Sequence, residues 1–162
     1  MVLSSRHEEP KRFLEILVDL LSLEFGIHVR PIGSMTFKRE EMQKGFEPDS
    51  AYYIAHATQM QGRDINAAGD PPPDLTIEVD ITSPSLPRFP IYAAFGVPEV
   101  WRYDGMRVTF HQLKGNRYLE IPASFAFPAL TSEIATRFME ERKRLPSNQW
   151  MGSVRDWARQ QR

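Results

Sequence analysis

One stretch of this chain, from Asp74 to Thr82, alternates between polar and apolar residues without a break. Successive side chains of a β-strand point to opposite faces, so this alternation predicts a strand with one buried apolar face. The other face carries three carboxylates, those of Asp74, Glu78 and Asp80. Alternate residues lie roughly 7 Å apart along a strand, so Glu78 and Asp80 repel each other, and a divalent metal ion would relieve that repulsion. A strand whose polar face simply meets solvent explains this segment alone equally well.

The composition is that of an ordinary water-soluble domain, with 41% hydrophobic and 25% charged residues in a chain of 162. That length predicts one domain with a substantial core. The absence of cysteine excludes disulfides, cysteine nucleophiles and thiolate zinc sites. No apolar run approaches the roughly 18–20 residues that cross a membrane, and the N-terminus lacks the pattern of a signal peptide. We therefore expect a cytoplasmic protein without a membrane partner.

Charge is distributed unevenly along the chain. The net charge of −1 argues against a globally basic nucleic-acid binder. Residues 1–100, however, carry a net charge of −6 and residues 101–162 one of +5. Such a division would suit a metal site beside a surface that contacts phosphates, although chance variation explains it nearly as well.

Hydrophobic periodicity predicts a mixed β-sheet flanked by α-helices, an α/β fold. A long connector, residues 56–73, is polar and ends in three prolines, so we expect it to be an exposed, mobile loop. We expect the main domain to span residues 1–145 and a C-terminal helical extension to span residues 146–162. The expected helices are 10–25 (beginning near residue 5 or near residue 9), 86–95, 131–144 and 147–161, and the expected strands are 27–39 (broken near Pro31 and Gly33), 50–55, 74–82, 98–103, 106–113 and 117–121.

The candidate site combines carboxylates from two strands. Asp49 begins a strand that would neighbour the one bearing Glu78 and Asp80, and two or three carboxylates with a phosphate suit Mg²⁺. Glu47 and Asp74 are further members of this group, and Glu24 is a weak candidate near the end of the first helix. The histidines lack the spacing of metal ligands, and no glycine-rich phosphate loop occurs.

Several motifs together resemble one protein family. They are Glu47-Pro48-Asp49, then Pro73 to Val79, then Ser83-Pro84-Ser85, and finally Tyr92 with Gly96 to Trp101. In residue types and spacing they resemble the Uma-two family, a group of restriction-endonuclease-like proteins within the PD-(D/E)XK nuclease superfamily. The resemblance extends from about His7 to about Phe127. It implies a restriction-endonuclease-like fold with a central mixed β-sheet and a metal-dependent phosphodiesterase centre.

The resemblance also implies roles for individual residues. Asp49 matches the first metal-binding aspartate, and Glu78 matches the glutamate of the second half-motif. The family's lysine lies on the following helix, four residues before the tyrosine, and here Arg88 occupies that position. Arginine can hold a phosphate but cannot act as a general base, because it stays protonated. Asp80 stands where the superfamily's usual strand lysine would sit, either as a further metal ligand or as a sign of a degraded site.

These observations lead to a principal hypothesis and two alternatives. The first is a metal-dependent endonuclease that hydrolyses nucleic-acid phosphodiester bonds, with DNA as the expected substrate. Asp49 and Glu78 would hold Mg²⁺ or Mn²⁺, Asp80 could add a ligand, and Arg88 would steady the phosphate. The second is a catalytically silent nuclease-fold domain that binds nucleic acid or protein, and the third is a structural dimer. A homodimer is compatible with the first hypothesis too, since the superfamily often dimerises.

Overall fold

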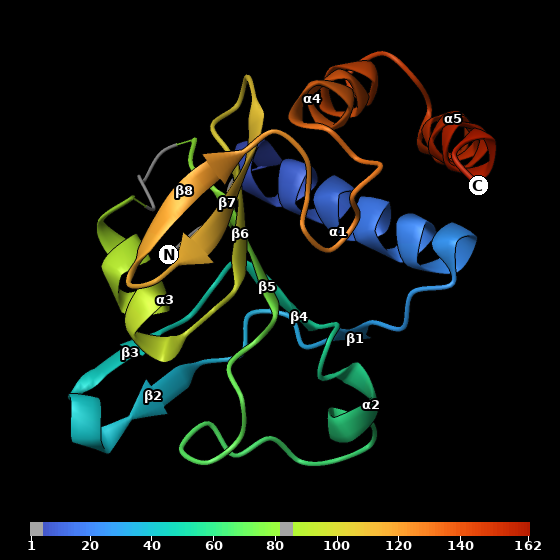
Figure 1. The fold of residues 1–162 in the computed structure, drawn as a ribbon. Helices are drawn as coiled ribbons and strands as arrows, with labels where there is room; N and C mark the ends of the chain where they lie inside the picture. Colours follow the sequence, from blue (N-terminus) through green and yellow to red (C-terminus); the bar gives the residue numbers. More distant parts are fainter. Residues whose placement is uncertain (1–4, 82–85) are drawn as a thin grey trace.

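The computed structural model describes residues 5–81 and 86–162. A six-stranded sheet with the strand order β1-β4-β5-β6-β7-β8 forms its centre (Figure 1). All neighbouring strands are antiparallel except β5 and β6, which are parallel. The strands of this sheet are β1 (Arg30–Pro31), β4 (Ser50–Tyr53), β5 (Leu75–Val79), β6 (Glu99–Tyr103), β7 (Val108–Lys114) and β8 (Arg117–Ile121).

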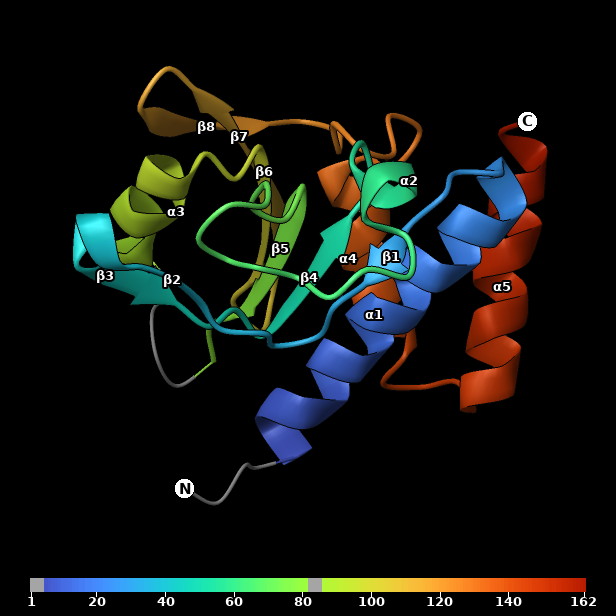
Figure 2. The ribbon, with the colours of Figure 1, turned by 90° about the horizontal axis from the view of Figure 1, so that it is seen from below.

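Helices cover both faces of the sheet, as the sequence predicted. Figures 1 and 2 show α1, α4 and α5 on one side and α3 on the other. A second, two-stranded sheet of β2 (Phe37–Arg39) and β3 (Lys44–Phe46) lies on the same side as α3. The helices are α1 (Ser5–Phe25), α2 (Ala57–Met60), α3 (Phe89–Phe95), α4 (Ser132–Glu141) and α5 (Ser147–Gln160), with short 3₁₀ helices η1 (Glu40–Met42) and η2 (Leu86–Arg88).

The main core lies between the sheet and α1, α4 and α5. The apolar face of β5, formed by Leu75, Ile77 and Val79, packs in this core and is almost completely shielded from solvent. Trp101 of β6 and Trp150 of α5 are fully buried in the same cluster. Burial of this apolar surface is the main stabilising contribution to the fold, and it fixes which face of β5 carries the carboxylates.

The polar face of β5 is also buried, which overturns the solvent-facing interpretation of this strand. Thr76 and Glu78 are completely shielded from solvent. A second cluster, containing Phe37 and Phe46 of the β2–β3 hairpin together with Tyr92 and Phe95 of α3, covers this side of the sheet. The aromatic rings pack closely, since the Phe46 centroid lies 4.8 Å from that of Tyr92 and 4.9 Å from that of Phe95. The carboxylate of Glu78 therefore lies buried beneath this second cluster.

Most of the expected elements are confirmed, with two clear differences. The region expected as a strand over 27–39 breaks after Pro31, as predicted, but its second part pairs with β3, which the sequence did not indicate. The connector 56–73 was expected to be an exposed loop; this is wrong for residues 57–60, which form α2 with Ala57 and Met60 buried. The first helix begins at Ser5, and the expected turn at Ser83-Pro84-Ser85 lies outside the described residues.

The C-terminal helix packs firmly on the first. Trp150, Val154 and Ala158 of α5 are buried in the main core, and Figure 2 shows α5 beside α1. Among the described residues, no helix combines the length and the apolar character required to cross a lipid bilayer.

Candidate active site

Asp49 and Glu78 meet because β4 and β5 pair in antiparallel register. Ser50 lies opposite Ile77, so one further step along the same register brings Asp49 opposite Glu78. The Val79 backbone N–H donates a hydrogen bond to Asp49 Oδ2 at 2.7 Å, which anchors the aspartate at the end of β4. A side-chain hydrogen bond also joins Asp49 to Glu78. The two carboxylates therefore lie in contact, as the sequence predicted.

Glu78 is the most constrained carboxylate of the group. The Arg88 guanidinium donates to Glu78 Oε2 at 2.9 Å, and the Tyr92 hydroxyl donates to Oε1. Burial first, together with the neighbouring charges of Asp49 and Asp80 and against the opposing charge of Arg88, raises the pKa of Glu78 to about 9. Without an added cation, Glu78 thus holds a proton at neutral pH.

Arg88 contacts Glu78 and so belongs to the same site, as the resemblance implied. It ends η2 and directly precedes α3, so the helix start sets its direction towards β5. Its side chain is 36% exposed whereas that of Glu78 is fully buried. The guanidinium therefore reaches from the buried carboxylate to the surface, where a charged ligand can meet it.

Asp80 faces a second arginine that sequence reasoning did not assign. Arg102 Nε donates to Asp80 Oδ2 at 2.5 Å, and the Asp80 side chain is fully buried. The parallel register of β5 and β6 places Arg102 beside Glu78. Arg102 therefore brings a positive charge to the position where the superfamily's strand lysine was expected, while its hydrogen bond occupies one oxygen of the proposed ligand Asp80.

His7 is another residue that the sequence gave no role. Its Nε2 lies 3.3 Å from Asp49 Oδ2, and it belongs to the first turn of α1. Only the folded position of α1 reveals this contact, because His7 and Asp49 are 42 positions apart in the sequence. No local pattern could have indicated it.

The weaker candidates lie elsewhere. Asp74, at the opposite end of β5 from Glu78, accepts hydrogen bonds from the backbone N–H groups of Ile54 and His56. Glu47 is exposed and accepts only from the Thr36 hydroxyl among the described contacts. Glu24 binds the C-terminal helix instead, through Arg155 Nε at 2.7 Å and two further arginines. These three residues do not join the site.

The donor set at the site suits a hard divalent cation. Within residues 5–81 and 86–162, no group of three or more histidine and carboxylate side chains is arranged to hold a metal ion. Asp49 and Glu78 nevertheless present two carboxylates in contact, and Mg²⁺ commonly uses one or two carboxylates together with waters and substrate phosphates. Oxygen ligands of this kind fit Mg²⁺ or Mn²⁺ better than softer metals.

Comparisons with known proteins place the chain in a family. No curated protein matches the sequence significantly. A crystal structure titled as "a putative nuclease belonging to DUF820" from Anabaena variabilis ATCC 29413 is similar, with a TM-score of 0.56 and 13% sequence identity over 86% of this chain and 84% of that one. This likeness supports a restriction-endonuclease-like fold. The family model Uma2, described as "Putative restriction endonuclease", matches residues 2–138. The resemblance seen in the sequence is thus confirmed, and the chain belongs to the Uma2 family.

Proposed function

We propose that this protein is a metal-dependent endonuclease that hydrolyses phosphodiester bonds of DNA. The observation that supports the proposal most strongly is the contact between Asp49 and the buried Glu78, with Arg88 on the second carboxylate. Structural ion pairs usually lie at the surface, and a buried carboxylate with a strongly raised pKa is more typical of a functional site. Membership of the Uma2 family agrees with a nuclease.

In this proposal Asp49 and Glu78 hold Mg²⁺ or Mn²⁺. When bound, such an ion would stabilise negative charge on the phosphate and lower the pKa of water nearby. The positive charge would also favour the ionised form of Glu78, whose pKa is otherwise raised to about 9. The Tyr92 hydroxyl keeps the carboxylate oriented by holding Oε1.

Arg88 is the residue best suited to bind the phosphate that is attacked. Its guanidinium has five N–H donors, of which the contact with Glu78 occupies one. The remaining donors can form two parallel hydrogen bonds to a phosphate and stabilise the charge that builds up on it. Arg88 cannot remove a proton from water, because it remains protonated at any ordinary pH.

Plasmid nicking tests this proposal directly. Supercoiled DNA incubated with the protein and Mg²⁺ or Mn²⁺ should be converted to the open circle, and EDTA should prevent this. Glu78→Gln and Asp49→Asn should each abolish nicking. Glu47→Gln is a matched control, because this exposed carboxylate lies two residues before Asp49 and outside the site. If the folded wild-type protein nicks no faster than Glu78→Gln, the proposed activity is wrong.

A catalytically silent, nucleic-acid-binding domain is the second candidate. The ion pair between Asp80 and Arg102 favours it, because the position of the superfamily's strand lysine here holds a carboxylate bound to arginine. This candidate predicts DNA binding that is unaffected by Glu78→Gln and no metal binding by calorimetry. The endonuclease proposal predicts that titration with Mn²⁺ gives a binding isotherm that Glu78→Gln removes.

We extend the proposal to a homodimer and to a cytoplasmic location. A homodimer would use an exposed edge of the sheet, and β8 is such an edge, with Leu119 47% exposed. Light scattering coupled to size-exclusion chromatography would distinguish a dimer from a monomer of 18.7 kDa. Action on DNA in the cytoplasm would agree with the absence of cysteine.

A further inference from the structure

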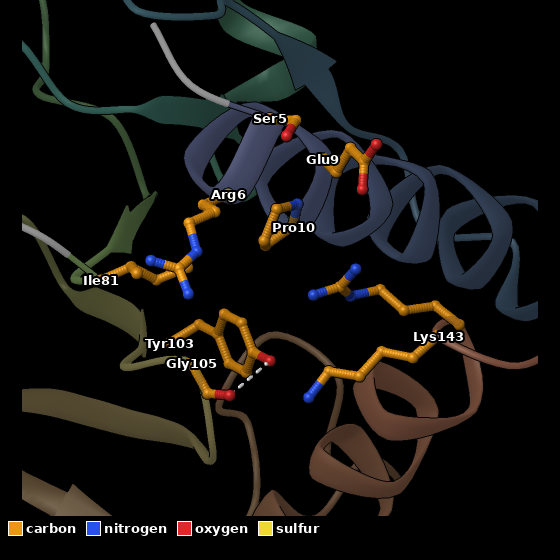
Figure 3. Close-up of a pocket in the computed structure, with 9 residues that line it drawn as sticks. Ser5, Arg6, Glu9, Pro10, Ile81, Tyr103, Gly105 and Lys143 are labelled. Atoms are coloured by element: carbon orange, nitrogen blue, oxygen red, sulfur yellow. Dashed lines mark hydrogen bonds between the residues drawn. The ribbon is translucent and has the colours of Figure 1, made fainter.

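A cavity of about 430 Å³ lies at the N-terminal end of α1 (Figure 3). Three parts of the chain enclose it: the first turns of α1, the end of the β5 region with the turn after β6, and the segment that follows α4. Figure 3 shows Arg6 and Lys143 entering the cavity from opposite sides, with Tyr103 between them. We refer to this space, lined by Arg6, Arg142 and Lys143, as the cationic cavity.

Positive charge dominates the cationic cavity. Of the described residues, three with basic side chains line it, together with one carboxylate, that of the exposed Glu9. Lys143 also forms an ion pair with Glu140 at 2.9 Å, but both side chains are close to half exposed, so this pair is weak and easily exchanged for another anion. The charge of the cavity therefore suits an anionic group.

Arg142 is held in place at the wall of the cationic cavity. Its guanidinium carbon lies 5.7 Å from the centre of the Phe13 ring, a stacking contact that holds the group in place. Its Nε atom is buried and has no hydrogen-bond partner among the described residues. Because Nε is shielded, the terminal nitrogens of the guanidinium are the donors that Arg142 can offer to a ligand in the cavity.

The first turn of α1 connects the cationic cavity to the site. Arg6 directly precedes His7 in the chain, and His7 Nε2 lies 3.3 Å from Asp49 Oδ2. Ile81, which lines the cavity, directly follows Asp80. Successive strand residues point to opposite faces, so the cavity lies on the α1 side of Ile81, and its connection to the carboxylate cluster runs from Arg6 through His7 to Asp49. A polymer that passes through the site can therefore place its next anionic group in the cavity.

We propose that the cationic cavity binds a backbone phosphate of the nucleic acid, one that flanks the phosphodiester bond held at Asp49 and Glu78. This inference rests on the proposed function for the identity of the polymer. Arg6 and Arg142 donate to the phosphate oxygens and Lys143 adds charge at the rim. Because backbone phosphates carry no sequence information, the cavity fixes the position of the strand and contributes no preference for a base.

Fluorescence anisotropy with a labelled DNA duplex in EDTA tests binding without cleavage. The double variant Arg6→Gln/Lys143→Gln should bind about tenfold more weakly at low salt, since charge-assisted hydrogen bonds to the phosphate are lost. Its plot of log affinity against log salt concentration should be shallower by about 1, as expected for the loss of one phosphate contact. Both changed side chains line the cavity from exposed positions, so the fold should be retained, which thermal unfolding would verify.

Two single variants act as controls of charge. Lys114→Gln removes one positive charge at the opposite end of β7 from the cavity, where the side chain is exposed, and it should leave the salt dependence unchanged. Glu9→Gln removes the one carboxylate that lines the cavity and should strengthen binding severalfold. Weaker binding by the double variant and stronger binding by Glu9→Gln, two changes at one cavity, would not arise from a general loss of folding.

Several results would overturn the inference. One is a double variant that binds DNA as the wild type and Lys114→Gln do; another is a wild-type protein that binds no DNA. A third is orthophosphate raising the melting temperature of the wild type alone while DNA affinity is the same in both, which would identify a site for free phosphate. Failure of the endonuclease proposal has a different signature, the lack of nicking that depends on Glu78, because anisotropy in EDTA does not require activity.

Discussion

Replacing Glu78 by glutamine should stabilise the metal-free protein at neutral and alkaline pH, although the same change abolishes the proposed activity. The pKa of Glu78 rises from an ordinary value of 4.5 in the unfolded chain to about 9 in the folded protein, mainly because the side chain is buried. Between these values the folded protein holds a proton that the unfolded chain lacks, so the free energy of unfolding falls as pH rises. Stability from this group is complete below pH 4.5 and is lost as pH approaches 9.

The size of the effect follows from the same pKa shift. At pH 7 the buried Glu78 must take up a proton when the wild-type protein folds. This costs about 3 kcal/mol of unfolding free energy relative to pH values below 4.5. Glutamine resembles the protonated acid and has no such pH-dependent cost. Its amide cannot accept from both Arg88 and Tyr92, which offsets the gain by about 1 kcal/mol. A net gain of about 2 kcal/mol at pH 7 corresponds to a melting temperature about 4–8 °C higher.

Urea unfolding in EDTA, followed by tryptophan fluorescence, measures this difference. Trp101 and Trp150 are fully buried and report on the core. The difference in unfolding free energy between Glu78→Gln and the wild type should be smallest near pH 5 and should grow up to pH 8.5. Addition of Mg²⁺ should stabilise the wild type and leave Glu78→Gln unchanged, because only the ionised carboxylate is a good ligand.

A control separates this effect from a general change in charge. Glu47→Gln removes the same charge from an exposed side chain and should show little dependence on pH. The reasoning would be refuted if Glu78→Gln were less stable than the wild type at pH 8, or if the difference between them did not change between pH 5 and pH 8.5.

Three further predictions concern the arginines and their carboxylate partners. Arg88→Ala should slow plasmid nicking about a hundredfold through loss of a donor to the phosphate, and Arg88→Lys should restore activity above that of Arg88→Ala; equal rates for all three proteins would remove Arg88 from the site. Arg102→Gln should lower the unfolding free energy by about 2–3 kcal/mol in urea, because Asp80 is buried beside it; an unchanged midpoint would contradict this. Arg155 and Arg159 hold the pKa of Glu24 below its usual value, so Glu24→Gln should lower the melting temperature at pH 7 and lose this effect below about pH 4 and in high salt.

The strand that carries the site could be predicted, whereas its environment could not. Alternation from Asp74 to Thr82 indicated the strand and the face of its carboxylates. The cover over that face comes from the β2–β3 hairpin, whose strands have three residues each and no clear alternation. Gly45 allows this hairpin, since a Cβ there would lie 2.8 Å from the Phe37 carbonyl oxygen. A sequence shows such a close approach only once the pairing is known.

A contact between opposite charges could be predicted only where the family resemblance already implied how the chain folds around it. The resemblance to the Uma-two family matched Arg88 to the displaced lysine of that family, and Arg88 indeed contacts Glu78. The contact of Arg102 with Asp80 depends on the parallel register of β5 and β6, which a helix-containing connection separates by about twenty residues. Nothing local to either residue fixes that register, so the sequence alone could not assign this contact.

The charges of the cluster explain how a fold tolerates so polar a buried face. Asp49, Glu78 and Asp80 are balanced by Arg88 and Arg102, and the proton that Glu78 holds makes the formal charge of these five residues zero. Burial of unbalanced charge costs several kcal/mol, so neutrality is what allows α3 and the β2–β3 hairpin to close over the strand. A divalent cation would change this balance and displace the proton from Glu78. Metal binding should therefore release close to one proton per ion at pH 7, and calorimetry in two buffers of different ionisation enthalpy would measure that number; a value near zero would mean that Glu78 is already ionised or is not a ligand.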